Sequence, residues 1–493
     1  MTFSDLFVTD SLTVLPELFL LTVSLALLVV GAVGSTSQSL QYPLLLPSLT
    51  WIGSVALAVT ALLVLWSPGV DSIVLYGFLV NDDASVFFRL LLLGSAFCVL
   101  LLSQSYFSQE NINAFEPLVL MLLAVSAMML MVSSLDLLGL YLALEFQSLC
   151  LYVLAATKRD SEFATEAGLK YFFLGALASG ILLLGCSLVY GYTGTTNLED
   201  CARLFAGCEE VVPPTVRLGL LCIGIAFLFK ASAAPFHMWA PDVYEGAPTP
   251  MTAFMATGPK VAVFALFARV YAYGFFDLLD VWQQLFLLCS VLSLVVGSFW
   301  ALAQYKMKRL LAFSSIGHVG FLLLGIATGT LEGLEAVLLY LVLYLAMTLT
   351  VFGTLLALQA PGARGRYIGD CAMLGRTNPL LAFGLALTFF SLAGIPPLAG
   401  FFSKVAILLS ALSAGLWPYA LCAVLLSVVS CFYYIRVVKA LYFEAPERWV
   451  PYTAMSASHA CILTVCTALT VVFVFYPAPL LKLCHMVALG FYM

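Results

Sequence analysis

Charged side chains stand inside long apolar runs of this sequence, where they could carry protons. Glu145 lies in LLGLYLALEFQSLCLYVLAA, and Lys230, Lys260 and Lys404 lie in runs that are equally apolar. Inserting a charged residue at the centre of a lipid bilayer costs about 2.5–3.5 kcal/mol, so each of them needs a reason to be there. Burial disfavours the charged form of a lysine, which makes release of its proton near neutral pH feasible. We therefore predict that these four residues translocate protons.

Proline accompanies each of the three lysines. The lysine-bearing stretches are AFLFKASAAPF, MATGPKVAVF and GIPPLAGFFSKVAIL. Proline removes a backbone donor and interrupts a helix. Interrupted helices occur at membrane depth only where they are buried in protein or line a water-filled cavity. We therefore expect a helix break beside each lysine, along a hydrated path. The prolines are Pro235, Pro259, Pro396 and Pro397.

Simpler interpretations remain open for several of these charges. Glu145 could be a structural acid held by a fixed hydrogen bond, and the three lysines could extend to the bilayer surface. Lys170 follows Glu166 by four residues in SEFATEAGLKYFFLG, which allows an ion pair at the membrane surface. The functional alternative is that Lys170 bridges the Glu145 region to Lys230 as a proton relay.

Two histidines are further candidates for relaying protons. His318 lies in LLAFSSIGHVGFLLLG and shares a helical face with Ser314 and Ser315. It is either a buried ring with its hydrogen bonds satisfied or a proton relay, because histidine titrates near neutrality. His237 follows Lys230 by seven residues, so on a continuing helix it would share a face with that lysine.

Membrane-spanning helices must position these side chains. The 493-residue chain is 63% hydrophobic and only 9% charged, too little polar surface for a soluble protein of this length. Long unbroken apolar runs exclude an outer-membrane barrel, whose strands alternate over about ten residues. We predict an all-α polytopic membrane protein with about 14 transmembrane helices, some of them discontinuous. The expected spans are 12–33, 42–66, 84–103, 115–133, 136–156, 165–190, 216–238, 249–274, 281–302, 309–328, 333–358, 378–410, 416–442 and 456–478.

The two halves of the chain show a faint internal repeat. In each half a span with a lone acid or histidine, Glu145 or His318, comes before an interrupted span that carries Lys230 or Lys404. Repeats of five helices each have opposite orientations in the membrane, as in many ion-coupled transporters. We predict N-terminal transmembrane helices in 1–110, two inverted five-helix repeats in 111–275 and 276–443, and a C-terminal helix and tail in 444–493.

Positively charged residues gather in alternate loops. With the spans above, 11 of the 20 Lys and Arg residues fall on the side of the 158–159 loop and 5 on the other, and 4 lie in or near spans. The positive-inside rule then places the 158–159 loop in the cytoplasm or matrix. Because the number of spans is even, we expect both termini on the opposite side.

The sequence carries no motif for a nucleotide, a redox centre or a metal. It has no Walker motif and no strand–GxGxxG–helix unit, and its 13 cysteines include no CxxC pair. No group of His, Cys and acidic residues has the spacing of metal ligands. We therefore expect no cofactor and no metal in this chain, and no nucleic-acid partner.

Four stretches together resemble one protein family. They are YLALEFQSLCLYVLAATKRDSEFATEAGLKYFFLGALASGILLLG, FLFKASAAPFHMWAPDVYEGAPTP, KRLLAFSSIGHVGF and SLAGIPPLAGFFSK. The chain resembles the subunit 2 family of mitochondrial NADH:ubiquinone oxidoreductase, respiratory complex I, with its bacterial and plastid counterparts. The resemblance extends over about 115–443, so nothing functional is carried over to the first 110 residues or to the tail.

The resemblance implies an antiporter-like, proton-pumping subunit of the membrane arm, active as a part of the reductase. In this family the residue matching Glu145 pairs with the one matching Lys230. The residues matching Lys260 and Lys404 continue a charged axis along the membrane, and His318 falls in the span that bridges them. Lys170 also matches a lysine of the family.

The resemblance also implies partners and a location. The partners would be other complex I membrane-arm subunits, including antiporter-like subunit 4 and the small subunits linking to the quinone site, within the lipid bilayer. NADH, FMN, Fe–S clusters and ubiquinone would bind other subunits. The location would be the mitochondrial inner membrane, with both termini on the intermembrane-space side, or alternatively a bacterial plasma membrane. Two other functions stay open: a stand-alone cation/proton antiporter of the related Mrp type, and a structural subunit whose lysines form fixed ion pairs.

Overall fold

The computed structural model confirms an all-α polytopic membrane protein. It describes residues 3–34, 46–67, 72–110, 115–158, 160–207, 213–358, 367–445 and 455–492. Within these residues there are 19 α-helices, and 13 helices are long and apolar enough to cross a membrane. Backbone groups in lipid must be paired within their own segment, which explains why almost every apolar run is a helix.

One predicted span is made of two short helices. The region expected at 378–410 forms α15 (Pro379–Ala393) and α16 (Ala399–Ser413), each too short to count among the 13 spans. Gly394 ends α15 in the left-handed conformation, with φ of 85°, and the following Pro396–Pro397 pair cannot continue a helix. This explains why the structure has 13 long spans where 14 were predicted, and it confirms a discontinuous helix next to Lys404.

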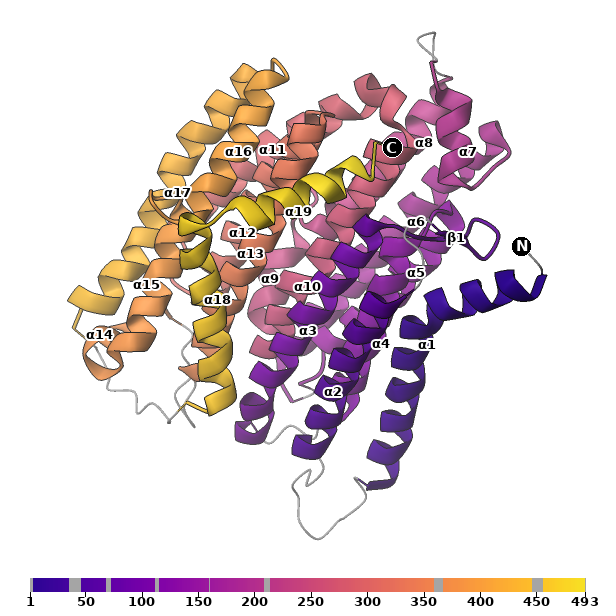
Figure 1. The fold of residues 1–493 in the computed structure, drawn as a ribbon. Helices are drawn as coiled ribbons and strands as arrows, with labels where there is room; N and C mark the ends of the chain where they lie inside the picture. The colour runs from indigo at the N-terminus through magenta and orange to yellow at the C-terminus, as the bar shows by residue number, and fades with distance from the viewer. Residues whose placement is uncertain are drawn as a thin grey trace. The chain divides into compact units, whose positions relative to one another are not determined.

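The chain forms two compact units, and the first comprises Met1–Lys230, Gly258–Val281 and Leu489–Met493. In this unit α1 packs on α2 and α4, α2 on α3, α4 on α5, and α5 on α6, so that consecutive helices lie side by side (Figure 1). The elements are α1 (Phe3–Gly34), α2 (Leu46–Trp66), β1 (Ser72–Val74), β2 (Leu79–Asn81), α3 (Asp83–Gln109), α4 (Phe115–Ser133), α5 (Leu137–Ala155), α6 (Glu162–Thr193), α7 (Leu198–Phe205), α8 (Pro214–Ala231), the end of α10 (Thr249–Phe267), the π-helical segment η1 (Ala268–Gly274) and the 3-10 turn η2 (Phe276–Leu278).

The second unit comprises Ala231–Thr257 and Trp282–Ala488. Its centre is α13, which packs against α12, α15, α16 and α18 and is buried along its length. The elements are α9 (Trp239–Gly246), the start of α10, α11 (Leu279–Leu302), α12 (Met307–Ala327), α13 (Leu331–Ala357), the 3-10 turn η3 (Ile368–Cys371), α14 (Leu374–Thr377), α15, α16, α17 (Trp417–Phe443), α18 (Ala457–Phe475) and α19 (Ala478–Leu489).

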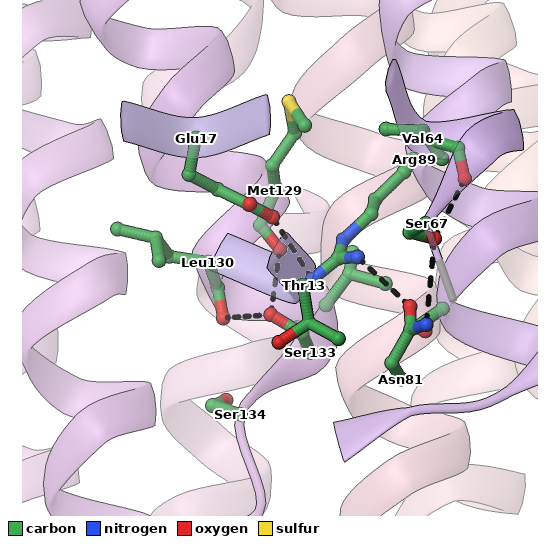
Figure 2. A network of polar contacts seen from close by, with 12 residues as sticks. Thr13, Glu17, Val64, Ser67, Asn81, Arg89, Met129, Leu130, Ser133 and Ser134 are labelled. Atoms are coloured by element: carbon green, nitrogen blue, oxygen red, sulfur yellow. Dashed lines mark hydrogen bonds and ion pairs between the residues drawn. The ribbon is translucent and has the colours of Figure 1, made fainter. Parts of the chain in front are cut away.

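A buried polar network joins α1, α3 and the β1–β2 hairpin in the first unit (Figure 2). Arg89 of α3 forms an ion pair with Glu17 of α1 at 2.9 Å, and both side chains are at most 2% exposed. Arg89 also donates to the Asn81 side chain at 3.1 Å, and Asn81 donates to Ser67 at 3.4 Å. Each buried charge therefore has an oppositely charged or polar partner, which offsets the cost of removing it from water.

A second buried ion pair involves Asp82, the residue that follows Asn81. Asp82 caps α3 through the backbone N–H of Ser85 at 2.8 Å and accepts two hydrogen bonds from Arg269 of η1, at 2.5 and 3.0 Å. Burial by itself would raise the pKa of Asp82, but the Arg269 guanidinium and the bonds from Ser85 outweigh it and lower that pKa to about 2. Asp82 thus connects the start of α3 to η1, the π-helical segment that follows α10.

Candidate functional site

The helix that carries Lys230 ends immediately after it. Helix α8 stops at Ala231, and Ser232 has a φ of 65°, which is left-handed and uncommon for a residue other than glycine. Pro235 then prevents an immediate return to helix, because the residue before a proline is disfavoured in the α conformation. The predicted break beside Lys230 is confirmed.

Tyr152 of α5 holds the ammonium group of Lys230. The Lys230 Nζ donates to the Tyr152 hydroxyl at 3.2 Å and lies 5.5 Å from the centroid of its ring. Tyr152 itself packs edge-on against Tyr171 of α6, with ring centroids 4.8 Å apart. Gly175 of α6 makes room for it, since a Cβ at that position would lie 2.0 Å from the Tyr152 hydroxyl. The lysine therefore has a rigid polar partner.

Glu145 lies on the same helix as Tyr152, seven residues earlier. It is half-buried. One of its carboxylate oxygens is buried and has no hydrogen-bond partner among the described residues. Tyr152 was not predicted as a functional residue, although its seven-residue spacing from Glu145 indicates that the two side chains share a face of α5.

Lys260 differs from the expectation, because its helix is not broken. Helix α10 runs without interruption through Pro259, and Lys260 within it is only 3% exposed. A proline frees the carbonyl four residues earlier, here that of Met255. The Tyr244 hydroxyl donates to this carbonyl at 3.4 Å, so a side chain replaces the missing backbone donor. The prediction of a break at Lys260 was wrong for this reason.

Lys404 caps the first half of the discontinuous span. Its Nζ donates to the carbonyls of Leu392 and Ala393 at 2.8 and 2.9 Å, the last two residues of α15, and it lies 5.4 Å from the ring centroid of Phe321. The C-terminal end of a helix carries partial negative charge, which a lysine cation stabilises. The lysine and the helix break therefore form one structural unit.

His318 of α12 has a tyrosine hydroxyl on each side of its ring. Nδ1 lies 2.6 Å from the hydroxyl of Tyr340 of α13, and Nε2 lies 3.0 Å from that of Tyr434 of α17. A small cavity is lined by His318, Tyr434 and Lys404 together. The structure thus brings together two residues predicted from sequence, His318 and Lys404. The two tyrosines were missed, because they are 22 and 116 residues away from His318.

The remaining two predicted residues lie in other surroundings. Lys170 of α6 is exposed and forms an ion pair with Glu166 at 2.7 Å, the surface pair considered as an alternative. His237 lies between α8 and α9, where the chain is not helical, so the seven-residue argument that placed it on the face of Lys230 was wrong. Its half-buried ring has an Nδ1 without a hydrogen-bond partner among the described residues.

Ion pairs fix the segment that follows the break after Lys230. Glu245 of α9 pairs with Lys306 and, at 3.2 Å, with Arg309, which stands near the start of α12. Arg309 also lies 3.5 Å from Asp242. These contacts attach α9 to the helix that carries His318.

A fold of this kind, with lysines beside discontinuous transmembrane helices, defines a class of ion-translocating membrane subunits. Residues 134–430 match the family described as NADH:quinone oxidoreductase/Mrp antiporter, transmembrane region. The chain belongs to this family, which confirms the resemblance seen in the sequence.

Individual relatives agree with this assignment. The chain is 47% identical to NADH-ubiquinone oxidoreductase chain 2 of Marchantia polymorpha, over 97% of this chain and 98% of that protein. It is 44% identical to NADH-quinone oxidoreductase subunit N of Rhodospirillum rubrum, over 97% and 96%. Among solved structures, a chain of respiratory complex I from Thermus thermophilus, solved with bound aureothin, matches with a TM-score of 0.80 and 33% identity, over 95% of this chain and 98% of that one.

Proposed function

We propose that this chain is a proton-translocating membrane-arm subunit of an NADH:quinone oxidoreductase. The observation that carries the proposal is that a lysine lies beside each of two interrupted helices, and that Lys230 contacts Tyr152 on the helix that carries Glu145. The relatives named as chain 2 or subunit N of this enzyme support the same conclusion.

The charge of Glu145 controls the proton on Lys230. An ionised carboxylate nearby favours the protonated lysine, and neutralising the carboxylate favours release of the proton. Each tenfold change in that equilibrium corresponds to about 1.4 kcal/mol, which in this mechanism a change of charge in a neighbouring subunit supplies. Tyr152 keeps the Lys230 Nζ in one position while the protonation of the lysine changes.

Lys404 is the site of proton release in this mechanism. Protons pass in the order Lys230, Lys260 and Lys404, with His318 as a relay. When Lys404 is charged, it caps the carbonyls at the end of α15, and when it is neutral that helix end loses its cation. Protonation is thereby linked to the state of the interrupted span.

The test is a Glu145→Gln variant in the assembled complex, reconstituted in liposomes. We expect proton translocation to fall by about tenfold or more, together with coupled quinone reduction. The reason is that a neutral glutamine cannot shift the protonation equilibrium of Lys230. The matched control is Glu162→Gln, an exposed acid in the first turn of α6, which should translocate protons normally. Full translocation by an assembled Glu145→Gln complex contradicts the proposal.

A stand-alone cation/proton antiporter is the second candidate, because the matching family includes Mrp antiporters. It predicts proton transport by the isolated chain that depends on sodium or potassium. A purely structural subunit predicts instead that neutral substitutions of Lys230 reduce assembly and leave coupling intact in whatever complex forms. The complex I function predicts loss of coupling in a complex that assembles fully.

The proposal includes partners, cofactors and location. Its partners are other membrane-arm subunits, including antiporter-like subunit 4 and the small subunits near the quinone site. NADH, FMN, Fe–S clusters and ubiquinone belong to other subunits of the complex. The membrane is the mitochondrial inner membrane, with both termini on the intermembrane-space side. A bacterial plasma membrane is the alternative, because a relative comes from the bacterium Rhodospirillum rubrum.

A further inference from the structure

Three helices of the second unit bring polar side chains together at His318. Tyr340 comes from α13 and Tyr434 from α17, and each hydroxyl is within hydrogen-bond distance of one ring nitrogen of His318 on α12. All three side chains are buried, with 1% of each tyrosine and 5% of the histidine exposed. Such a group is costly to bury unless its hydrogen bonds are made, so its geometry is tightly specified.

The chemistry of the ring gives these two hydrogen bonds a direction. A neutral imidazole has one N–H donor and one acceptor nitrogen. When Nε2 carries the proton, it donates to the Tyr434 oxygen, and Nδ1 accepts from the Tyr340 hydroxyl. The three groups then form one continuous chain of hydrogen bonds from Tyr340 through His318 to Tyr434.

The Tyr434 end of this chain opens on the cavity that contains Lys404. That cavity is lined by Tyr434, Ser430, Tyr433 and Lys404, besides His318 itself. His318 also lines a second small cavity, with Ser314, Ser315 and Tyr344. His318 thus lines both small cavities, and of the two only the first is also lined by Lys404.

We propose that Tyr340 and Tyr434 are proton-relay residues on the two sides of His318. Tyr340 accepts a proton and passes its own hydroxyl proton to Nδ1. Nε2 releases its proton to the Tyr434 oxygen, and Tyr434 releases its hydroxyl proton into the cavity of Lys404. One proton enters at Tyr340, one leaves from Tyr434, and the imidazole ring changes tautomer. The cycle is complete when the ring has returned to its first tautomer and both hydroxyl groups to their first orientation. This inference rests on the proposed function and names further residues that carry it out.

The test uses Tyr340→Phe and Tyr434→Phe in the assembled complex, reconstituted in liposomes. Each change removes one oxygen and leaves the ring in place, and we expect proton translocation per NADH oxidised to fall by about tenfold or more. The solvent isotope effect on translocation should change as well, a result that a merely structural tyrosine would not give. The control is Tyr271→Phe, which removes another buried hydroxyl, one that donates to Leu220 at 2.8 Å in the first unit.

His318→Gln separates this inference from the proposed function. Glutamine can donate and accept as histidine does, but it cannot exchange tautomers, so its complex should fold and fail to translocate. If His318→Gln fails while both tyrosine variants translocate normally with an unchanged isotope effect, the tyrosine relay is wrong and the proposed function stands. If Glu145→Gln translocates normally, the proposed function is wrong.

Discussion

Lys230 and Lys404 are held by different kinds of hydrogen-bond acceptor. Lys230 donates to a tyrosine hydroxyl, whereas Lys404 donates to two backbone carbonyls. A phenol oxygen and a carbonyl oxygen both accept hydrogen bonds from an ammonium group. The two lysines are thus both stabilised when charged, but only the charge of Lys404 is connected directly to a helix end.

The position of Tyr152 depends on a glycine of the neighbouring helix. Gly175→Ala would place a Cβ 2.0 Å from the Tyr152 hydroxyl, so the tyrosine must move away from Lys230. We expect proton translocation to fall, at a stability cost of about 1–3 kcal/mol. Gly180→Ala on the same helix is the control, since nothing lies within 4 Å of its Cβ. Normal translocation by Gly175→Ala would show that Tyr152 does not position the lysine.

At the scale of helices, the three proline-containing lysine spans behave differently. The helix stops after Lys230, divides into α15 and α16 before Lys404, and continues through Pro259 beside Lys260. The three spans differ in which groups form hydrogen bonds with the backbone next to the proline. In α10 the Tyr244 hydroxyl supplies the donor that Pro259 lacks, so the helix continues without a break.

A double-mutant cycle tests this account of α10. Tyr244→Phe leaves the Met255 carbonyl without its donor and should destabilise the protein by about 1–3 kcal/mol, measured as heat stability of the purified complex. Pro259→Ala restores a backbone N–H four residues after Met255. In that background the loss caused by Tyr244→Phe should shrink. Equal losses in both backgrounds would show that the tyrosine stabilises α10 in some other way.

At the scale of the whole molecule, buried charges join segments that lie far apart in the chain. Asp82 and Arg269 are 187 residues apart and form a double hydrogen bond inside the first unit. Through Asn81 and Arg89 the contacts extend to Glu17 of α1. Asp82, in the first 110 residues to which no function was assigned from sequence, therefore contacts the segment that follows the helix of Lys260.

The Asp82–Arg269 pair predicts a particular pH dependence of stability. The pKa of Asp82 is lowered from 3.8 to about 2, so its contribution is fully present above about pH 4 and is lost as the pH falls through 2. Asp82→Asn should cost about 3–5 kcal/mol at pH 7, measured by denaturant unfolding, and less at pH 3 than at pH 6. Asp83→Asn, an exposed acid one residue later, should cost little. A cost for Asp82→Asn that does not change with pH would contradict the ionised pair.

The sequence by itself determined the membrane class, most of the spans, the charged residues that lie within them, and the breaks next to Lys230 and Lys404. Hydropathy and proline act within one segment, so each of these features is encoded locally. Only the tertiary structure decided that α10 passes through Pro259, that His237 leaves the helix, and that tyrosines from two other helices meet His318. The Tyr244 hydroxyl and the two tyrosines at His318 come from other helices, and the spacing of residues within one helix carries no information about such contacts.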